Sequence, residues 1–278
     1  MENLLLPSQI EFIAGDTPNK GSLVVSPCYH GYGTTLGNSL RRVLLSSLPG
    51  AAVEGFKIKG VQHEFTAIDD IKEDAVEIMM NLKQLAVKVF SDDPITLTIT
   101  KKGAGKVTAK DIKKNSEVEI VNPDHVIAEI TGKKEFEMEI IVGRGRGFKP
   151  AEDKDRKNYD LGTIVIDSIY TPIKDIGYKV EYTRVGDITN YEKLVLDIET
   201  NGTVDPKEAL VSSTKILMDH YTLVIDNLEN KTTEEVVEEE KEVEEVKEEV
   251  EEKEEVVEEE KEEKKVKKVK KSKATKKK

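Results

Sequence analysis

Residues 33–50 read GTTLGNSLRRVLLSSLPG and predict an amphipathic helix over about residues 35–48. The apolar residues recur at spacings of three and four, which places their side chains on one face of an α-helix. Thr34 or Thr35 can cap the start of the helix, and Pro49-Gly50 ends it. We therefore expect one apolar face, which consists of Leu36, Leu40, Val43, Leu44 and Leu48.

The opposite face of this helix has a different character, because Leu45 lies there between Arg41 and Arg42. An apolar residue flanked by two arginines, away from the main apolar stripe, indicates a second contact surface. We expect the fold to use the leucine face and a partner protein to use the arginine face.

Several other segments alternate apolar and polar residues in the manner of half-buried strands. Residues 135–140 alternate glutamates with large apolar residues, and residues 95–99 alternate threonines with isoleucine and leucine. Residues 180–182 and 194–196 read similarly, and breaks such as Asn122-Pro123 separate the segments. Strands combined with a few helices indicate an α+β fold.

A second helix is predicted to begin at Asp205-Pro206, with proline at the first helical position and Glu208 completing a capping box. A stripe of near-heptad spacing follows, made of Leu210, Thr214, Leu217, Tyr221, Val224 and Leu228. Such a stripe packs one helix against another element. It fits burial against the chain's own sheet and it fits dimerisation, and periodicity alone favours the first.

Residue types that enzymes use for catalysis are present, but the sequence does not group them into a catalytic motif. The sequence has no glycine-rich phosphate loop and no dinucleotide-binding fingerprint. Asp69-Asp70 and Asp92-Asp93 lie in turn-like polar stretches. We expect no catalytic residue, no metal site and no cofactor in this chain, and we interpret as ordinary packed or surface residues Cys28, His30, His63, His125 and His220. The single cysteine fits a reducing cytoplasm, and residues 1–10 do not resemble a secretion signal.

Glycine and arginine alternate over residues 143–147 directly after a predicted strand. Such a run can approach a phosphate backbone closely, or it can bend a strand so that its arginines pair with acidic residues of a partner. The motif is short, and the protein-contact interpretation is favoured.

Charge is distributed unevenly along the chain of 278 residues, whose net charge is −12. Residues 234–263 contain 19 glutamates and 4 lysines, residues 264–278 contain 10 lysines and no acidic residue, and the remaining body is therefore mildly acidic at −7. Valines recur every seven residues in the acidic part, but glutamate or lysine fills most of the partner positions. We expect a disordered or transiently helical tail, which either binds DNA weakly through its lysines or only aids solubility.

At residues 33–53 the sequence closely resembles the signature helix of bacterial RNA polymerase alpha subunits. The likeness continues in the same order through residues 60–65, 73–78, 81–83, 143–148, 199–203 and 205–206. It covers about the first 230 residues. The usual small C-terminal DNA-binding domain of that family is not expected here, because the residues after Asn230 lack apolar periodicity.

The resemblance implies a discontinuous dimerisation subdomain, a sheet plus two helices, built from residues 1–52 and 177–233. A mainly β subdomain of residues 53–176 is inserted into it, and the charged tail covers residues 234–278. The resemblance also implies that the near-heptad stripe of the second helix lies at the dimer interface rather than against the chain's own sheet. The expected interface residues are Leu36, Leu40, Val43, Leu44, Leu210, Leu217, Tyr221, Val224 and Leu228.

The resemblance further implies a non-catalytic scaffold, located in the cytoplasm and on the nucleoid, since polymerisation is carried out by another chain. A homodimer nucleates assembly in this family, with one copy binding the beta subunit and the other the beta-prime subunit. The omega and sigma subunits are further partners in the assembled enzyme. By position, the residues that match the large-subunit contacts are Arg41, Arg42, Leu45, Lys83, Ile166 and Asp167.

Overall fold

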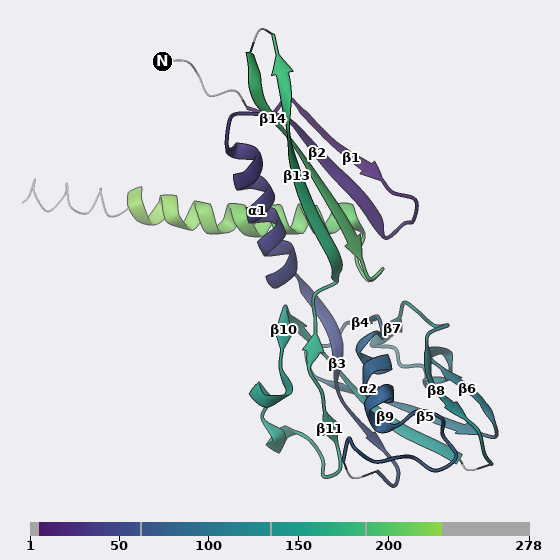
Figure 1. Cartoon of the computed structure of the whole chain (residues 1–278). Coiled ribbons are helices and arrows are strands. Elements are labelled where there is room, and N and C mark those ends of the chain that lie inside the picture. The colour runs from purple at the N-terminus through teal and green to yellow at the C-terminus, as the bar shows by residue number, and fades with distance from the viewer. Residues whose placement is uncertain (1–5, 62, 134, 187, 230–278) are drawn as a thin grey trace, which may run out of the picture. The chain divides into compact units, whose positions relative to one another are not determined.

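The computed structural model describes residues 6–61, 63–133, 135–186 and 188–229 (Figure 1). It confirms an α+β fold with more strands than helices. Among the described residues, those up to Leu217 form one compact unit, and a second unit begins at Met218. The predicted charged tail lies outside the described residues.

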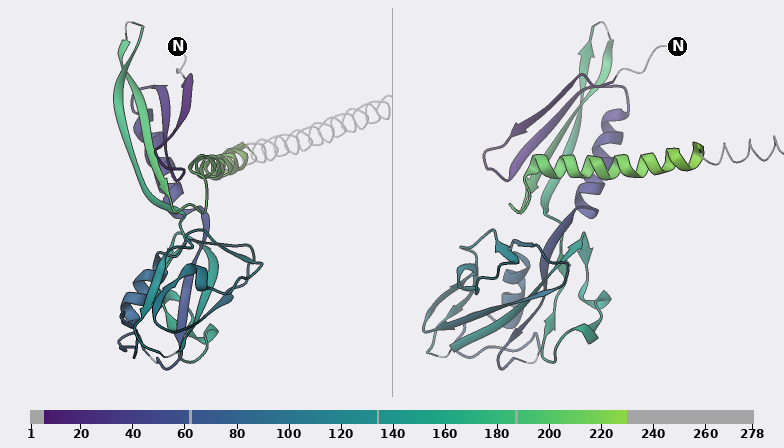
Figure 2. Two further views of the ribbon diagram at one scale, coloured as in Figure 1. Left: turned by 90° about the vertical axis from the view of Figure 1, so that its right-hand side faces the viewer. Right: turned by 180° about the vertical axis from the view of Figure 1, so that it is seen from behind.

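The first sheet is antiparallel and has the strand order β1-β2-β14-β13 (Figures 1 and 2). These strands come from both ends of the body: β1 (Gln9–Ala14), β2 (Lys20–Cys28), β13 (Ile173–Val185) and β14 (Ile188–Thr200). Helix α1 (Tyr32–Ser46) packs against β13 and β14. Gly33 and Gly37 make this close approach possible, because a Cβ at Gly37, for example, would lie 2.7 Å from the ring of Tyr178.

The apolar face of α1 forms the core of this region. Leu40, Leu44 and Leu48 are buried, and they cluster with Leu196 and Ile198 of β14. Helix α1 begins at Tyr32, earlier than the predicted start near Thr35, and it has no side-chain cap from its own first turn. The prediction that a threonine caps this helix is therefore wrong.

A second sheet has the order β11-β3-β9-β5 and a core of its own. Its strands are β3 (Pro49–Ile58), β5 (Ile95–Lys102), β9 (Glu135–Arg146) and β11 (Ile164–Val165). The alternation predicted for residues 95–99 and 135–140 is confirmed, because the apolar residues of both segments are buried. Shorter ladders complete the region: β4 (Val87–Val89) with β7 (Val118–Ile120), β6 (Gly105–Thr108) with β8 (Val126–Ile130), and β10 (Phe148–Lys149) with β12 (Ser168–Ile169).

Helix α2 (Ala75–Lys83) covers the second core through Ile78 and Leu82. Sequence reasoning did not identify this helix. A local signal was present, because the Asp74 carboxylate caps the helix by accepting a hydrogen bond of 2.7 Å from the Glu77 N–H. Three short 3₁₀ turns are also present, at Ala109–Asp111, Ala151–Asp153 and Arg156–Asn158.

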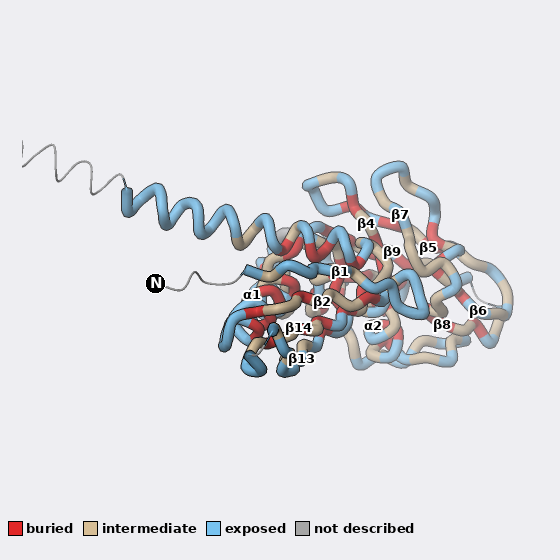
Figure 3. The backbone as a smooth tube through the Cα atoms, turned by 90° about the horizontal axis from the view of Figure 1, so that it is seen from above, coloured by how far each residue is buried: buried red, intermediate tan, exposed pale blue. Residues whose placement is uncertain are grey.

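The last described helix covers residues 206–229. It begins as predicted, with Asp205 accepting hydrogen bonds from the N–H groups of Lys207 and Glu208 at 3.0 and 3.4 Å. Ala209 and Leu210 are buried in the first core, whereas every residue from Met218 to Glu229 is exposed (Figure 3).

Candidate assembly surfaces

The outward face of α1 carries the predicted arginine surface. Arg42 and Leu45 are exposed there, and within the described part of the chain the Arg42 guanidinium makes no hydrogen bond or ion pair. Arg41 differs, because its Nε donates to the Ile176 carbonyl oxygen of β13 at 3.3 Å. Arg42 and Leu45 are thus available to a partner, whereas Arg41 partly serves to hold the helix on its sheet.

A carboxylate from a distant strand positions this helix. Glu192 of β14 accepts hydrogen bonds from the N–H groups of Gly31 and Gly33 at 2.9 and 3.0 Å. These groups lie at the helix start, where the backbone donors lack intrahelical partners and a negative charge is stabilising. Gly33 leaves room for this cap, because a Cβ there would lie 2.9 Å from Glu192 Oε2. Sequence reasoning missed Glu192, since no local pattern links residues so far apart.

The α1 residues expected at the dimer interface divide into two groups. Leu36 is 36% exposed and Val43 is half-buried, so both reach the surface on one flank of the helix. Leu40 and Leu44 are 9% and 0% exposed and belong to the chain's own core. For these two leucines the expectation is corrected, because their side chains are not on the surface.

The helix of residues 206–229 shows the same division. Leu210 is buried and is corrected to a core residue, and Leu217 is half-buried. Tyr221, Val224 and Leu228 are exposed, and their place at a dimer interface stays a prediction. A further exposed row at the same seven-residue spacing was missed by sequence reasoning, and it consists of Val211, Met218 and Ile225.

Lys83 and Asp167, both expected to contact a large subunit, are brought together although they lie 84 residues apart. Lys83 Nζ at the end of α2 lies 2.9 Å from Asp167 Oδ2, and Asp167 Oδ1 accepts from the Ala151 N–H at 2.9 Å. The Ala151 N–H and then Lys83 hold the pKa of the Asp167 carboxyl below its usual value. Ile166 is 1% exposed, so its expected contact role is corrected: its side chain belongs to the core.

A buried polar network lies next to this pair and was not found from sequence. The Glu54 carboxylate accepts from Tyr170 Oη at 2.7 Å and from Tyr159 Oη at 3.2 Å. Burial, followed by the Glu54 charge, raises the pKa of Tyr159 to about 12. Lys154 is also buried and hydrogen-bonds to neighbouring backbone. These groups line a cavity of about 520 Å³.

The glycine-arginine motif has a structural explanation. A Cβ at Gly143 would lie 2.3 Å from the Glu54 carboxylate, and a Cβ at Gly145 would lie 2.8 Å from the Tyr170 ring. The glycines therefore make room for the chain's own side chains. Arg144 pairs with Asp92 at 2.8 Å within the chain, and the expected contact of these arginines with a partner stays a prediction.

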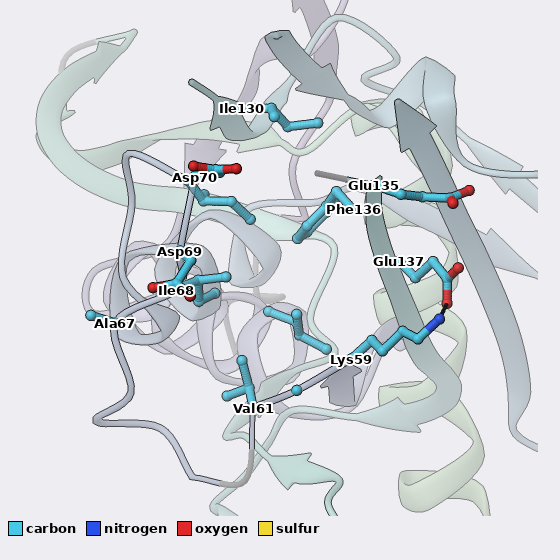
Figure 4. Close-up of a pocket in the computed structure, with 13 residues that line it drawn as sticks. Lys59, Val61, Ala67, Ile68, Asp69, Asp70, Ile130, Glu135, Phe136 and Glu137 are labelled. Atoms are coloured by element: carbon cyan, nitrogen blue, oxygen red, sulfur yellow. Dashed lines mark ion pairs between the residues drawn. The ribbon is translucent and has the colours of Figure 1, made fainter. Parts of the chain in front are cut away.

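A cavity of about 230 Å³ lies in the second region, and Figure 4 shows its lining. Asp69, Asp70, Glu135 and Glu137 contribute carboxylates, but Lys59 pairs with Glu137 at 2.8 Å. Asp69-Asp70 lies in a turn, as expected. Among the described residues no group of acidic, histidine or cysteine side chains is arranged to hold a metal ion. The same residues include no helix long and apolar enough to span a membrane.

Comparisons with known proteins identify relatives of this chain. The family described as "RNA polymerase Rpb3/RpoA insert domain" matches residues 56–171. The chain is 48% identical over 221 residues to the DNA-directed RNA polymerase subunit alpha of Macrococcus caseolyticus, a match that covers 80% of this chain and 70% of the relative. The corresponding subunit of Oceanobacillus iheyensis is 45% identical over the same shares, and that of Bacillus velezensis is 48% identical over 76% of this chain and 67% of its own.

Proposed function

The chain belongs to the family of DNA-directed RNA polymerase alpha subunits, and from this premise we propose that it homodimerises and nucleates assembly of the beta and beta-prime subunits. Its role is that of a non-catalytic subunit of a nucleotidyltransferase complex. The omega and sigma subunits are proposed as further partners in the assembled enzyme. No cofactor is proposed for this chain.

The observation that carries the dimer proposal is the exposed apolar surface of the last described helix. Its side chains at Met218, Tyr221, Val224 and Ile225 are 53–61% exposed. Apolar side chains gathered on one helix in this way mark a surface that another protein covers. A second copy of the chain is the occupant that the family relationship supports.

Two surfaces are proposed for the large subunits. The first is the outward face of α1, where Arg42 and Leu45 are exposed. Arginine suits such a contact because its planar head donates several hydrogen bonds to one partner. The second is the Lys83–Asp167 pair, whose carboxylate is fixed in orientation by the Ala151 N–H.

Reconstitution tests the assembly proposal directly. The full chain is mixed with purified beta and beta-prime subunits, and native mass spectrometry counts the subunits in the product. We expect a complex with two copies of this chain and one of each large subunit. Asp167→Ala is expected to leave the dimer intact and to weaken recruitment. A chain that stays apart from both large subunits would overturn the proposal.

Three smaller proposals complete this assignment. The body divides into a dimerisation subdomain of residues 1–52 and 177–233 and an insert of residues 53–176. The two separate apolar clusters support such a division, although Ile173 and Ile176 of β13 pack in the cluster of the first sheet. The protein works in the cytoplasm, at the nucleoid. The ten lysines of residues 264–278 give weak, salt-sensitive contact with DNA.

A further inference from the structure

Lys154 carries an ammonium group in the protein interior, and its side chain is fully hydrogen-bonded. The residue is 5% exposed. Its Nζ lies 3.1 Å from the Glu54 carbonyl oxygen, 2.5 Å from the Ile166 carbonyl oxygen and 2.5 Å from Ser168 Oγ. An ammonium has three N–H donors, so each donor has an acceptor. These acceptors are neutral groups, and therefore the contacts fix backbone positions rather than form an ion pair.

The acceptors lie where the ladder of the second sheet is interrupted. The pairing of β3 with β9 shifts register between Val53 and Gly55, which leaves Glu54 in a bulge. The pairing of β11 with β3 ends at Val165, and β12 begins with β10 as its partner at Ser168. Two other hydrogen bonds cross this gap, from the Ile166 N–H to the Glu54 carbonyl oxygen at 3.0 Å and from Ser168 Oγ to the Val53 carbonyl oxygen at 2.7 Å. Lys154 adds three more between the same segments, where the regular ladder is interrupted.

Asp167 lies inside the same gap, between two residues that Lys154 holds. Its carboxylate accepts from Ala151 N–H on one side and from Lys83 on the other. The backbone N–H of Lys154 donates to the Ala151 carbonyl oxygen at 3.4 Å. Lys154 and Asp167 therefore bind the same 3₁₀ turn, Ala151–Asp153, one from its end and one from its start.

We propose that Lys154 is a positioning residue, which acts through the backbone of residues 166–168 to hold the Asp167 carboxylate in place beside Lys83. The consequence for assembly rests on the proposed function of the Lys83–Asp167 surface. If a large subunit binds there, loss of the Lys154 contacts weakens recruitment even though Lys154 itself is buried and does not touch the partner.

Burial is the main influence on the Lys154 amine, and it lowers the pKa of this group to about 8. The carboxylates of Glu54 and Asp167 oppose that shift, and the ammonium groups of Lys149 and Lys83 add to it. Other titratable groups that line the cavity with Lys154 are Asp155, Tyr159, Asp160 and Tyr170.

Because of this lowered pKa, the stability of the closed gap is expected to depend on pH. When the gap opens and Lys154 reaches water, its pKa returns to about 10.4. Between these two values the closed form binds fewer protons than the open form, so opening becomes less favourable as the pH rises. From pH 7 to pH 9 the protection of backbone amides in the gap is expected to rise by about tenfold beyond the intrinsic change in exchange rate.

Hydrogen exchange of the full chain, read by NMR at the amides of Ala151 and Ile166, tests the proposal. Lys154→Met is expected to lower both protection factors by about tenfold, since a lost hydrogen bond from a charged donor has about that effect, and to abolish their dependence on pH. Lys149→Met is the matched control, because it removes a lysine from the same cavity without removing a contact in the gap. Since the Lys149 charge is only a minor contribution to the Lys154 pKa, this variant should change both protection factors far less than Lys154→Met does. Unchanged protection in Lys154→Met would overturn the proposal. If that variant does not fold, a pH-independent protection factor in the unmodified chain overturns it equally.

Measuring how well each variant recruits the large subunits distinguishes a failure of the Lys154 proposal from a failure of the proposed Lys83–Asp167 surface on which it rests. We expect Lys154→Met and Asp167→Ala to weaken recruitment by similar factors, with Lys149→Met unaffected. Normal recruitment by Asp167→Ala would remove the Lys83–Asp167 pair from the assembly surface, while the exchange result would still decide whether Lys154 positions Asp167.

Discussion

Replacing Tyr221 or Val224 with glutamate should convert the dimer into a monomer. Both side chains lie on the exposed part of the last described helix, at 58% and 55% exposure. Full burial of one such side chain is worth ~1.5–3 kcal/mol, so covering the exposed half contributes ~1 kcal/mol. Four residues of this kind in each copy, Met218, Tyr221, Val224 and Ile225, contribute ~8 kcal/mol to a symmetric dimer, against an association cost of ~4–15 kcal/mol.

A glutamate in this surface removes one favourable contribution and places an unpaired charge in an apolar contact. A two-fold symmetric interface contains the substitution twice, so the combined loss is at least ~4 kcal/mol, or about a thousandfold in the dimer dissociation constant. Sedimentation equilibrium of the full chain at micromolar concentration measures this change. Asp226→Lys serves as the control, because it alters charge outside the apolar rows of the same helix.

Two outcomes would refute the reasoning. An unmodified chain that sediments as a monomer at every accessible concentration would show that the exposed apolar surface does not bind a second copy. Glutamate variants that remain dimeric would show that the dimer forms through another surface. Circular dichroism of each variant confirms that the helix itself persists.

Other predictions concern separate parts of the chain. Arg42→Ala should leave dimerisation intact and weaken beta-subunit recruitment in a pull-down, and lost dimerisation with normal recruitment would reverse the assignment of the two α1 faces. Glu192→Ala should lower the free energy of unfolding by about 2–4 kcal/mol, because two backbone N–H groups lose a charged acceptor, and thermal denaturation measures this loss. Gly145→Val should destabilise the second sheet through its contact with Tyr170, whereas Gly177→Ala, with open space around it and no positive φ, should disturb no packing. Removing residues 264–278 should abolish weak, salt-sensitive DNA binding in a titration with unrelated fragments, and equal affinity of both forms would leave those lysines without a DNA role.

Local patterns predicted the elements better than they predicted the surfaces. Alternation at residues 135–140 identified β9, because one face of that strand is buried and the other is not. The leucine spacing of α1 predicted its apolar face, but periodicity does not distinguish a chain's own core from a partner's surface. The resemblance to the alpha subunits, and not this spacing, placed Leu44 at a dimer interface, although the side chain is completely buried within the chain.

Long-range contacts explain the remaining differences. The start of α1 depends on Glu192, and the Lys83–Asp167 pair joins residues from separate elements. Neither contact has a signature in the spacing of neighbouring residues. The Lys154 network was missed for the same reason, since a lysine in a polar segment is usually exposed.

The cap that Glu192 provides has a consequence for synthesis on the ribosome. The first residues of α1 leave the ribosome long before Glu192 is made, and so do β1 and β2, whose neighbour in the sheet is β14. The apolar cluster of residues 53–166, by contrast, is complete in a nascent chain that has not yet reached β14. Vectorial synthesis therefore favours early folding of the second region, while the segment that precedes it waits for the strand that closes its sheet. The surface around Arg42, which we propose as a partner-binding surface, is completed late, after most of the body has been translated.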